Sequence, residues 1–320
     1  MASKCYACYC LDDAIRNESS SGGIFYCLAK DIIEDGGVVF GAAFDEGFQV
    51  FHTYAETLDQ LKPLLKCKYV QSRMGNSFKQ VKSFLKEGRK VLFCGTPCQT
   101  AGLLAFLGKK YDQLILVDFI CHGVPSAKVW RHYLQDVAAG RTVTDVKFRD
   151  KTNGWSNYSV KYSFGDGSTY FTYWRGDPYM NGFVGDLYLR PSCHACRFKG
   201  FERSSDITLG DFWGIKKQLP DMFDDKGTSV VVVHSQKGAA AMKRIGPQLK
   251  TRKVTEEMIK ARNPMINISA KKHQMRDVFV KSDMIDVRNH IDQIVPYKEE
   301  TGVGAYLKKA VKKVRKVLKG

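Results

Sequence analysis

The sequence predicts an α/β (α+β) protein in which a mixed β-sheet is flanked by helices, with a smaller antiparallel β insertion and a helical C-terminus. Three observations support this prediction. Short β-type runs alternate with helical patterns up to about residue 140. From residue 142 to 173 the pattern changes to two-residue alternation around "FGDGS", which is typical of antiparallel strands. One more buried run, "SVVVVHS", precedes helical patterns that continue to the end.

The first region contains the predicted strands "KCYACYCL", "GVVFGAAF", "FQVFHTYA", "KVLFCG" and "LILVDFIC". Helices are expected between and after them, at 22–34, 58–65, 77–86, 99–107 and 126–138. Glycines stand just past several of these segments, where a left-handed residue often ends a helix. We therefore expect a main domain at 1–235 with an antiparallel insertion at about 142–175, a helical part at 236–300, and a basic amphipathic tail at 301–320.

The composition indicates one compact unit with a subdomain, because 320 residues with 44% hydrophobic content can bury a substantial core. No apolar run reaches the length of a membrane span, and the start "MASKCYACYC" lacks the features of a secretory signal. We therefore expect a cytoplasmic protein. Its ten cysteines are then expected to be metal ligands or buried side chains rather than disulfides.

The formal net charge of +17 predicts an acidic partner. Residues 305–320 hold seven Lys or Arg and no acid, so the rest of the chain still carries +10. Apolar residues recur at helical spacing in this tail, which favours a helix lying on an anionic membrane at its inner face over a solvated, frayed end. Nucleic-acid binding is not predicted, because the tail lacks interleaved aromatic residues and no recognised nucleic-acid motif is present.

The segment "SCHAC" supplies two cysteines, Cys193 and Cys196, at a spacing that suits one ion or cluster but fills only half a site. Cys98 and Cys121 each follow an apolar strand, at the sheet edge where open α/β folds hold ligands. Together they give the four thiolates that an iron–sulfur cluster or a structural zinc requires. The alternative is a turn with two packed thiols, and the pattern favours the metal site.

The other cysteines are expected to pack rather than to bind metal. Strand alternation places Cys8 and Cys10 on one face of the first strand and Cys5 on the other. Neighbouring residues of an extended segment also point to opposite sides, which argues against a catalytic pair of Cys121 and His122. The remaining thiols lie within a strand or have no spaced partner: Cys27, Cys67 and Cys94.

Three segments are candidates for binding a phosphate or a ring system. "SSSGG" precedes an amphipathic helix, where it either caps the helix or holds an anion, and it contains Ser20, Ser21, Gly22 and Gly23. "GTPCQ" forms a similar strand-to-helix turn with Gly95, Thr96 and Pro97. "KYVQS" either binds a phosphate and stacks on a ring or is an exposed strand edge, and it offers Lys68, Tyr69, Gln71 and Ser72. GxGxxG, HExxH and GxSxG are absent, so a Rossmann fingerprint and the commonest hydrolases are not predicted.

The motifs "SSSGGIF", "YVQS", "GTPCQ", "CHGVPS" and "SCHACRFK" followed by "SSDITLGDFWG" occur in this order over about residues 5–235. With them the sequence resembles the coenzyme F-420 hydrogenase/dehydrogenase beta-subunit family, most closely its bacterial branch. The resemblance implies an iron–sulfur flavoprotein oxidoreductase with FAD and a [4Fe-4S] cluster. It also implies that the cluster ligands are Cys98, Cys121, Cys193 and Cys196, and that the three phosphate-binding candidates surround the FAD.

Many relatives carry an N-terminal ferredoxin module, whereas this sequence begins at the first strand. A separate ferredoxin or another acidic electron-transfer protein is therefore expected to dock on the basic body. Bacterial relatives often occur among genes for cell-surface polysaccharides, so a role in that biosynthesis is expected and the electron acceptor stays open.

Two further groups lie around the CxxC and at the end of the strand that follows it. Four cations either offset the cluster charge or form a solvated loop: Arg190, Arg197, Lys199 and Arg203. Asp211 and Trp213 either line the pocket or form a turn. The alternative function is a non-catalytic adaptor, stabilised by zinc or a cluster and held at the membrane by its tail.

Overall fold

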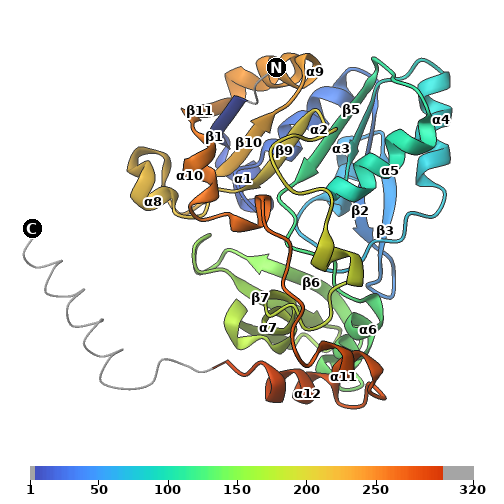
Figure 1. The fold of residues 1–320 in the computed structure, drawn as a ribbon, viewed down its shortest axis with the longest axis vertical. Coiled ribbons are helices and arrows are strands. Elements are labelled where there is room, and N and C mark those ends of the chain that lie inside the picture. The colour runs from blue at the N-terminus through green and yellow to red at the C-terminus, as the bar shows by residue number, and fades with distance from the viewer. Residues whose placement is uncertain (1–3, 298–320) are drawn as a thin grey trace, which may run out of the picture.

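A mixed eight-stranded sheet forms the centre of the main body in the computed structural model, which describes residues 4–297 (Figure 1). The strand order is β11-β1-β10-β9-β5-β4-β2-β3. Strands β2, β4, β5 and β9 run parallel, while both edges of the sheet pair antiparallel. The strands are β1 Lys4–Cys10, β2 Val38–Phe44, β3 Val50–Ala55, β4 Val91–Cys94, β5 Leu114–Phe119, β9 Ile207–Asp211, β10 Ser229–Val233 and β11 Leu249–Val254. The predicted mixed sheet is confirmed.

Helices cover both faces of this sheet (Figure 1). On one face lie α2 (Ile24–Glu34), the short α3 (Leu58–Leu61) and α9 (Gln236–Ile245). Helix α2 buries Ile24, Leu28 and Ile32, which recur every four residues and so share one side of the helix. The other face is covered by α4 Ser77–Lys86, α5 Pro97–Leu107, α8 Ile215–Gln218 and α10 Glu256–Lys260.

The first strand packs its cysteines as the alternation predicts. Cys8 and Cys10 lie in the core beneath α2, together with Cys27, whereas Cys5 lies in the core on the opposite face. All four are buried. These thiols therefore fill core space, since they lie away from the surface and pack among apolar side chains.

A second, three-stranded antiparallel sheet forms the smaller part of the molecule, which lies below the main sheet in Figure 1. Its aromatic core includes Trp130, Tyr133, Tyr162 and Tyr179. The hairpin turn at "FGDGS" contains Gly167 in the left-handed region, with φ of 81°. The elements are β6 Val143–Asp150, β7 Ser159–Phe164, β8 Thr169–Tyr173, α6 Ala127–Ala138, α7 Pro178–Val184, α11 Arg276–Lys281 and α12 Val287–Ile294. The predicted antiparallel insertion is present.

The structure contains helices and a strand that the sequence did not predict. Helix α1 (Asp13–Glu18) and helix α7 were not expected, and strand β11 replaces part of the helical C-terminal region. The sequence of β11, "LKTRKV", is largely exposed and polar, so its strand character comes from pairing with β1 rather than from an apolar pattern. None of the helices within residues 4–297 is long and apolar enough to cross a bilayer. The expected basic tail at 301–320 lies outside the described residues.

Candidate functional site

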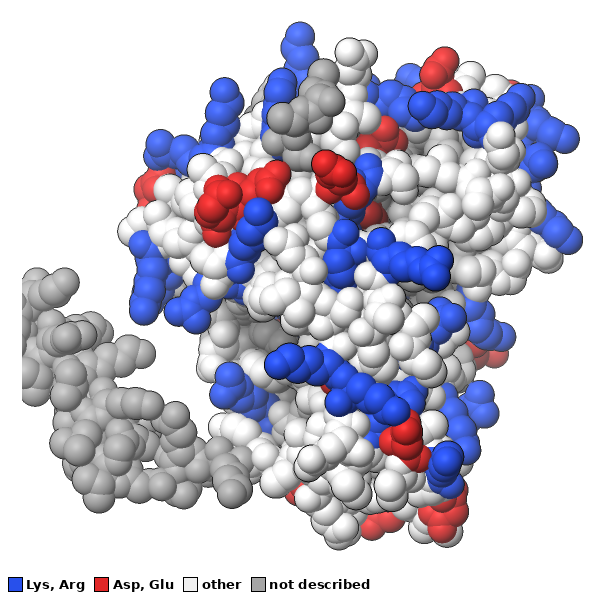
Figure 2. All heavy atoms as spheres, in the orientation of Figure 1, with Lys and Arg blue, Asp and Glu red and all other residues white. Residues whose placement is uncertain are grey.

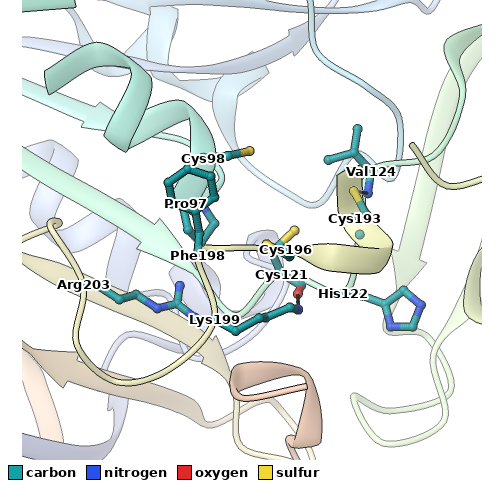
Figure 3. A pocket seen from close by; sticks show the side chains of 11 residues that line it. Pro97, Cys98, Cys121, His122, Val124, Cys193, Cys196, Phe198, Lys199 and Arg203 are labelled. Atoms are coloured by element: carbon teal, nitrogen blue, oxygen red, sulfur yellow. Dashed lines mark hydrogen bonds between the residues drawn. The ribbon is translucent and has the colours of Figure 1, made fainter. Parts of the chain in front are cut away.

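The four cysteines of the predicted metal site line one pocket between the main sheet and the CxxC segment (Figure 3). In Figure 3 the thiols of Cys98, Cys193 and Cys196 point into a common space, and Cys121 lies beside Cys196. The other residues that line the pocket are Pro97, His122, Gly123, Val124, Phe198, Lys199 and Arg203. Residues that are almost one hundred positions apart in sequence thus supply thiols to one place.

Each cysteine is positioned by a strand end or a tight turn. Cys98 is in the first turn of α5, where Thr96 and Gln99 form a reciprocal capping box. Strands β4 and β5 are parallel neighbours, so Cys121, two residues beyond β5, emerges at the same sheet edge as the start of α5. Cys193 lies in the short helix η3 (Pro191–Ala195), and Cys196 follows it.

Hydrogen bonds fix the two loops that carry the CxxC. The backbone N–H of Val124 donates to Sγ of Cys193 at 3.3 Å, which joins the loop after β5 to η3. The backbone N–H of Cys196 donates to Oγ of Ser269 at 3.1 Å. A donor aimed at a ligating sulfur stabilises its thiolate form, so the Val124 contact suits a metal ligand, while the Ser269 contact fixes the backbone at Cys196.

The donor set fits an iron–sulfur cluster. Among the described residues, no three His, Cys, Asp or Glu side chains are spaced to hold one metal ion. A single zinc needs every thiolate at about 2.3 Å, whereas the thiolates of a four-iron cluster bind different irons and lie further apart. Burial raises the pKa of the Cys121 thiol to about 12, and the Lys199 charge acts in the opposite direction. Iron binding would therefore displace the thiol protons.

The four predicted cations divide into two pairs. Lys199 and Arg203 line the pocket, and Lys199 donates from Nζ to the carbonyl oxygens of Cys121 at 2.6 Å and Met265 at 2.8 Å. The other pair, Arg190 and Arg197, is exposed and does not line the pocket. Only the first pair is therefore placed to interact directly with a group held by the cysteines.

The serine–glycine turn is held firmly at the start of α2. Gly22 donates its N–H to Oγ of Ser229 at 3.0 Å, and a Cβ at this position would lie 2.6 Å from the carbonyl oxygen of Cys8. Gly23, with φ of 84°, is the N-cap residue of α2. Oγ of Ser20 is buried without a hydrogen-bond partner, whereas Oγ of Ser21 donates to the carbonyl of Thr228. The turn is thus tightly packed and retains an unpartnered hydroxyl.

The "KYVQS" segment is an ordered coil rather than a strand edge. Nζ of Lys68 donates to the carbonyl of Leu65 at 2.7 Å, and burial lowers its pKa to about 8. The Tyr69 ring stacks on Phe183 with ring centroids 5.0 Å apart, and the hydroxyl of Tyr179 donates to the Tyr69 carbonyl. Gln71 is half-buried. Of the residues expected to surround FAD, only Pro97 lines the cysteine pocket, while Gly95 and Thr96 form the turn behind it.

Ser72 is hydrogen-bonded to His52, a residue that the sequence analysis did not propose for the site. Oγ of Ser72 lies 2.6 Å from Nδ1 of His52, and Nε2 of His52 lies 3.1 Å from the carbonyl oxygen of Cys94. Because a carbonyl can only accept, Nε2 carries the proton and Nδ1 accepts from the serine hydroxyl. Burial lowers the pKa of His52 to about 4.

This histidine is expected to make stability depend on pH. The unfolded chain takes up a proton near pH 6.5 and the folded protein only near pH 4, so the His52 contribution is complete above pH 6.5. As the pH falls to 4, about 3 kcal/mol of unfolding free energy is lost. Urea unfolding at a series of pH values measures this slope. His52→Gln is expected to reduce the dependence of the unfolding free energy on pH. The control His132→Gln replaces a partly exposed histidine of α6 and should leave that dependence unchanged. An identical slope in all three proteins would contradict this assignment.

Arg149 is a further buried group that the sequence analysis did not find. Its side chain is 1% exposed, pairs with Asp211 through Nη1, and lies over the rings of Tyr158 at 4.7 Å and Trp213 at 5.2 Å. Asp211 also accepts from Nε1 of Trp155 at 3.0 Å. Nε and Nη2 of Arg149 are buried without an acceptor. Two unpartnered donors beside aromatic rings fit an acidic, planar ligand.

Strand β6 connects Arg149 with two of the candidate segments. Burial raises the pKa of the Tyr69 hydroxyl well above its usual value, and the nearby Arg149 charge opposes this. Lys151, the residue just after β6, donates from Nζ to the carbonyls of Arg16, Ser21 and Lys226. The C-terminal end of β6 and the residue after it therefore reach both the "KYVQS" segment and the serine–glycine turn. No sequence signal marks Arg149, because "VKFRDK" resembles an exposed strand.

Comparisons with known proteins identify a family and a similar fold. The family model that describes the C terminus of the coenzyme F420 hydrogenase/dehydrogenase beta subunit matches residues 88–257, which include all four cysteines of the pocket. Among solved structures, a chain of the F420-reducing [NiFe] hydrogenase complex from Methanosarcina barkeri is similar, with a TM-score of 0.54 and 17% identity over 84% of this chain and 95% of that chain. At this identity the likeness concerns the fold. No curated protein sequence matches the chain.

Proposed function

Because the chain belongs to the coenzyme F420 hydrogenase/dehydrogenase beta-subunit family, we propose that it is an iron–sulfur flavoprotein oxidoreductase. It passes electrons between an acidic carrier protein, a [4Fe-4S] cluster and FAD, and from there to a further acceptor. The observation that carries the proposal is the convergence of four thiols on one pocket. FAD exchanges a hydride or two electrons and the cluster one electron at a time, so the pair joins one-electron carriers to two-electron chemistry.

The cluster is held by Cys98, Cys121, Cys193 and Cys196. The N–H of Val124 donates to Sγ of Cys193, and the cations Lys199 and Arg203 line the pocket. These groups offset the negative charge of a cluster bound by four thiolates. Lys199 also fixes the Cys121 carbonyl, so the loop after β5 is held in place. These residues orient the ligands and set the electrostatic environment of the cluster.

The flavin is held by the two segments that β6 and the residue after it contact, namely "KYVQS" and the serine–glycine turn. Arg149 offers two buried donors beside Tyr69, which suits the acidic part of an isoalloxazine ring. The turn of Ser20 to Gly23 offers the Ser20 hydroxyl, together with the positive end of the 11-residue helix α2, to the diphosphate. Lys151 holds this turn at its Ser21 carbonyl.

A series of ring contacts leads from the cysteine pocket to Tyr69. His122, next to Cys121, contacts the edge of Phe183 with ring centroids 5.0 Å apart, and Phe183 stacks on Tyr69 at 5.0 Å. Nε2 of His122 is bonded to Oδ1 of Asp186 at 2.7 Å, which fixes the imidazole. Two ring contacts thus separate the pocket from the residues assigned to the flavin, which supports direct electron exchange between the two groups.

Exposed cations near the CxxC form the docking surface for the carrier: Arg190, Arg197, Lys271 and Lys272. The last two follow Ser269 and Ala270, which contact the CxxC segment itself. Figure 2 shows Lys and Arg side chains across the middle of this face of the molecule. A positive surface beside the cluster attracts an acidic protein and speeds its association.

Reduced ferredoxin is expected to bleach the visible absorption of the bound flavin in an anaerobic stopped-flow experiment. The rate should fall as the ionic strength rises, because salt screens the attraction between the two proteins. Arg197→Glu should slow it several-fold, whereas Lys86→Glu, an exposed change at the end of α4, should not. A protein loaded with both cofactors whose flavin stays oxidised in excess reduced ferredoxin would contradict the proposed function.

A further inference from the structure

The side chain of Arg203, on the loop before β9, lines the cysteine pocket beside Phe198 and Lys199 (Figure 3). Its side chain is 4% exposed. Nε donates to the carbonyl of Gly200 at 3.0 Å, and Nη1 donates to Oδ1 of Asp118 at 3.1 Å and to the carbonyl of Phe119 at 3.2 Å. Three acceptors therefore hold two of the three nitrogens in fixed positions.

Asp118 makes this arrangement rigid. Its side chain is 1% exposed, and its Oδ1 also accepts from the Thr208 hydroxyl at 2.5 Å. Asp118 belongs to β5 and Thr208 to β9, which pair directly in the sheet. The orientation of Arg203 is thus set by the centre of the main sheet, not by a flexible loop alone.

Nη2 of Arg203 is the nitrogen that has no acceptor, although it is buried. A buried, charged N–H without an acceptor is costly, so a partner is expected in the protein's working state. The pocket offers thiols on its other walls, and Lys199 already uses protein carbonyls as acceptors. Because Arg203 lines the same pocket, a group held there by the thiols would supply the missing acceptor.

Resting on the proposed function, we infer that Nη2 of Arg203 donates a hydrogen bond to a sulfur of the bound cluster and sets its reduction potential. A cluster gains negative charge when it is reduced, so a fixed donor and positive charge stabilise the reduced state more than the oxidised one. Removal of the donor should shift the midpoint potential to a more negative value. Arg197 is exposed outside the pocket, where solvent screens its charge, so it should have little influence on the midpoint potential.

The test is an anaerobic redox titration of the full chain, followed by electron paramagnetic resonance, with iron quantified on each sample. Arg203→Gln should have a more negative midpoint potential than the wild type. Arg203→Lys keeps the positive charge but lacks the forked set of N–H donors, so its midpoint potential should lie between those of Arg203→Gln and the wild type. The matched control Arg197→Gln should match the wild type. If Arg203→Gln does not retain the cluster, the comparison of Arg203→Lys with the wild type decides the question.

An unshifted potential in a cluster-loaded Arg203→Gln, or in Arg203→Lys where only that variant holds the cluster, would overturn the role of Arg203. It would leave the proposed function intact. A wild-type protein that contains no cluster under the same conditions would contradict the proposed function itself, so the two failures are distinguishable. A shift in Arg197→Gln equal to that in Arg203→Gln would also overturn the inference, since it would reflect net charge alone.

Discussion

Cys193→Ser is expected to lose most of the iron and acid-labile sulfide while keeping its fold. The substitution removes one of the four thiols that face the pocket, and serine replaces it with almost the same volume. Cys193 is only partly buried and lies on the short helix η3, so the core is little disturbed. Iron and sulfide per chain, measured on anaerobically purified protein beside a thermal unfolding curve, test this expectation.

Cys67→Ser is the matched control for this experiment. Cys67 is also partly buried and precedes the "KYVQS" segment, but it does not line the cysteine pocket. The control should keep its full iron content. Full iron in Cys193→Ser, or an equal loss in Cys67→Ser, would show that the pocket does not hold the cluster.

Arg149→Met is expected to destabilise the protein by about 3–5 kcal/mol and to abolish flavin binding. The substitution leaves the partly buried carboxylate of Asp211 without its cation, and it removes the two donors assigned to the flavin. Urea unfolding measures the first effect. Titration of the flavin-free protein with FAD, followed by the change in flavin fluorescence, measures the second.

The double variant Arg149→Met with Asp211→Asn separates the two effects. Asparagine removes the unpaired charge and can still accept from Nε1 of Trp155, so part of the lost stability should return. Flavin binding should not return, because the donors of Arg149 are still missing. A double variant that binds FAD as tightly as the wild type would exclude Arg149 from the flavin site.

The fold class could be predicted because strands and helices are marked by short stretches of sequence. Apolar runs and helix-ending glycines marked the parallel strands and most of their helices, and the rule that ligands gather where such strands end led to Cys98 and Cys121. The structure brings these two thiols to the CxxC pocket. Their role as cluster ligands stays a prediction, as does the flavin role of the serine–glycine turn.

The features that sequence reasoning missed depend on tertiary contacts. Arg149 is buried although the polar residues on either side of it in sequence, Lys147 and Asp150, are only partly buried, so the sequence of β6 does not distinguish it from an exposed arginine. Asp118 and Arg203 are 85 positions apart and meet only in the folded sheet. Strand β11 forms because β1 offers it a free edge, and its own polar sequence gives no strand signal.

The most direct test of the central claim is an absorption spectrum of the anaerobically purified wild-type chain, with iron, sulfide, zinc and flavin quantified on the same sample. An iron–sulfur flavoprotein should be brown, with about four irons and four sulfides per chain and bound FAD. A colourless protein with stoichiometric zinc, no iron and no flavin would contradict the central claim. That result would identify a structural adaptor that keeps the fold without the redox chemistry.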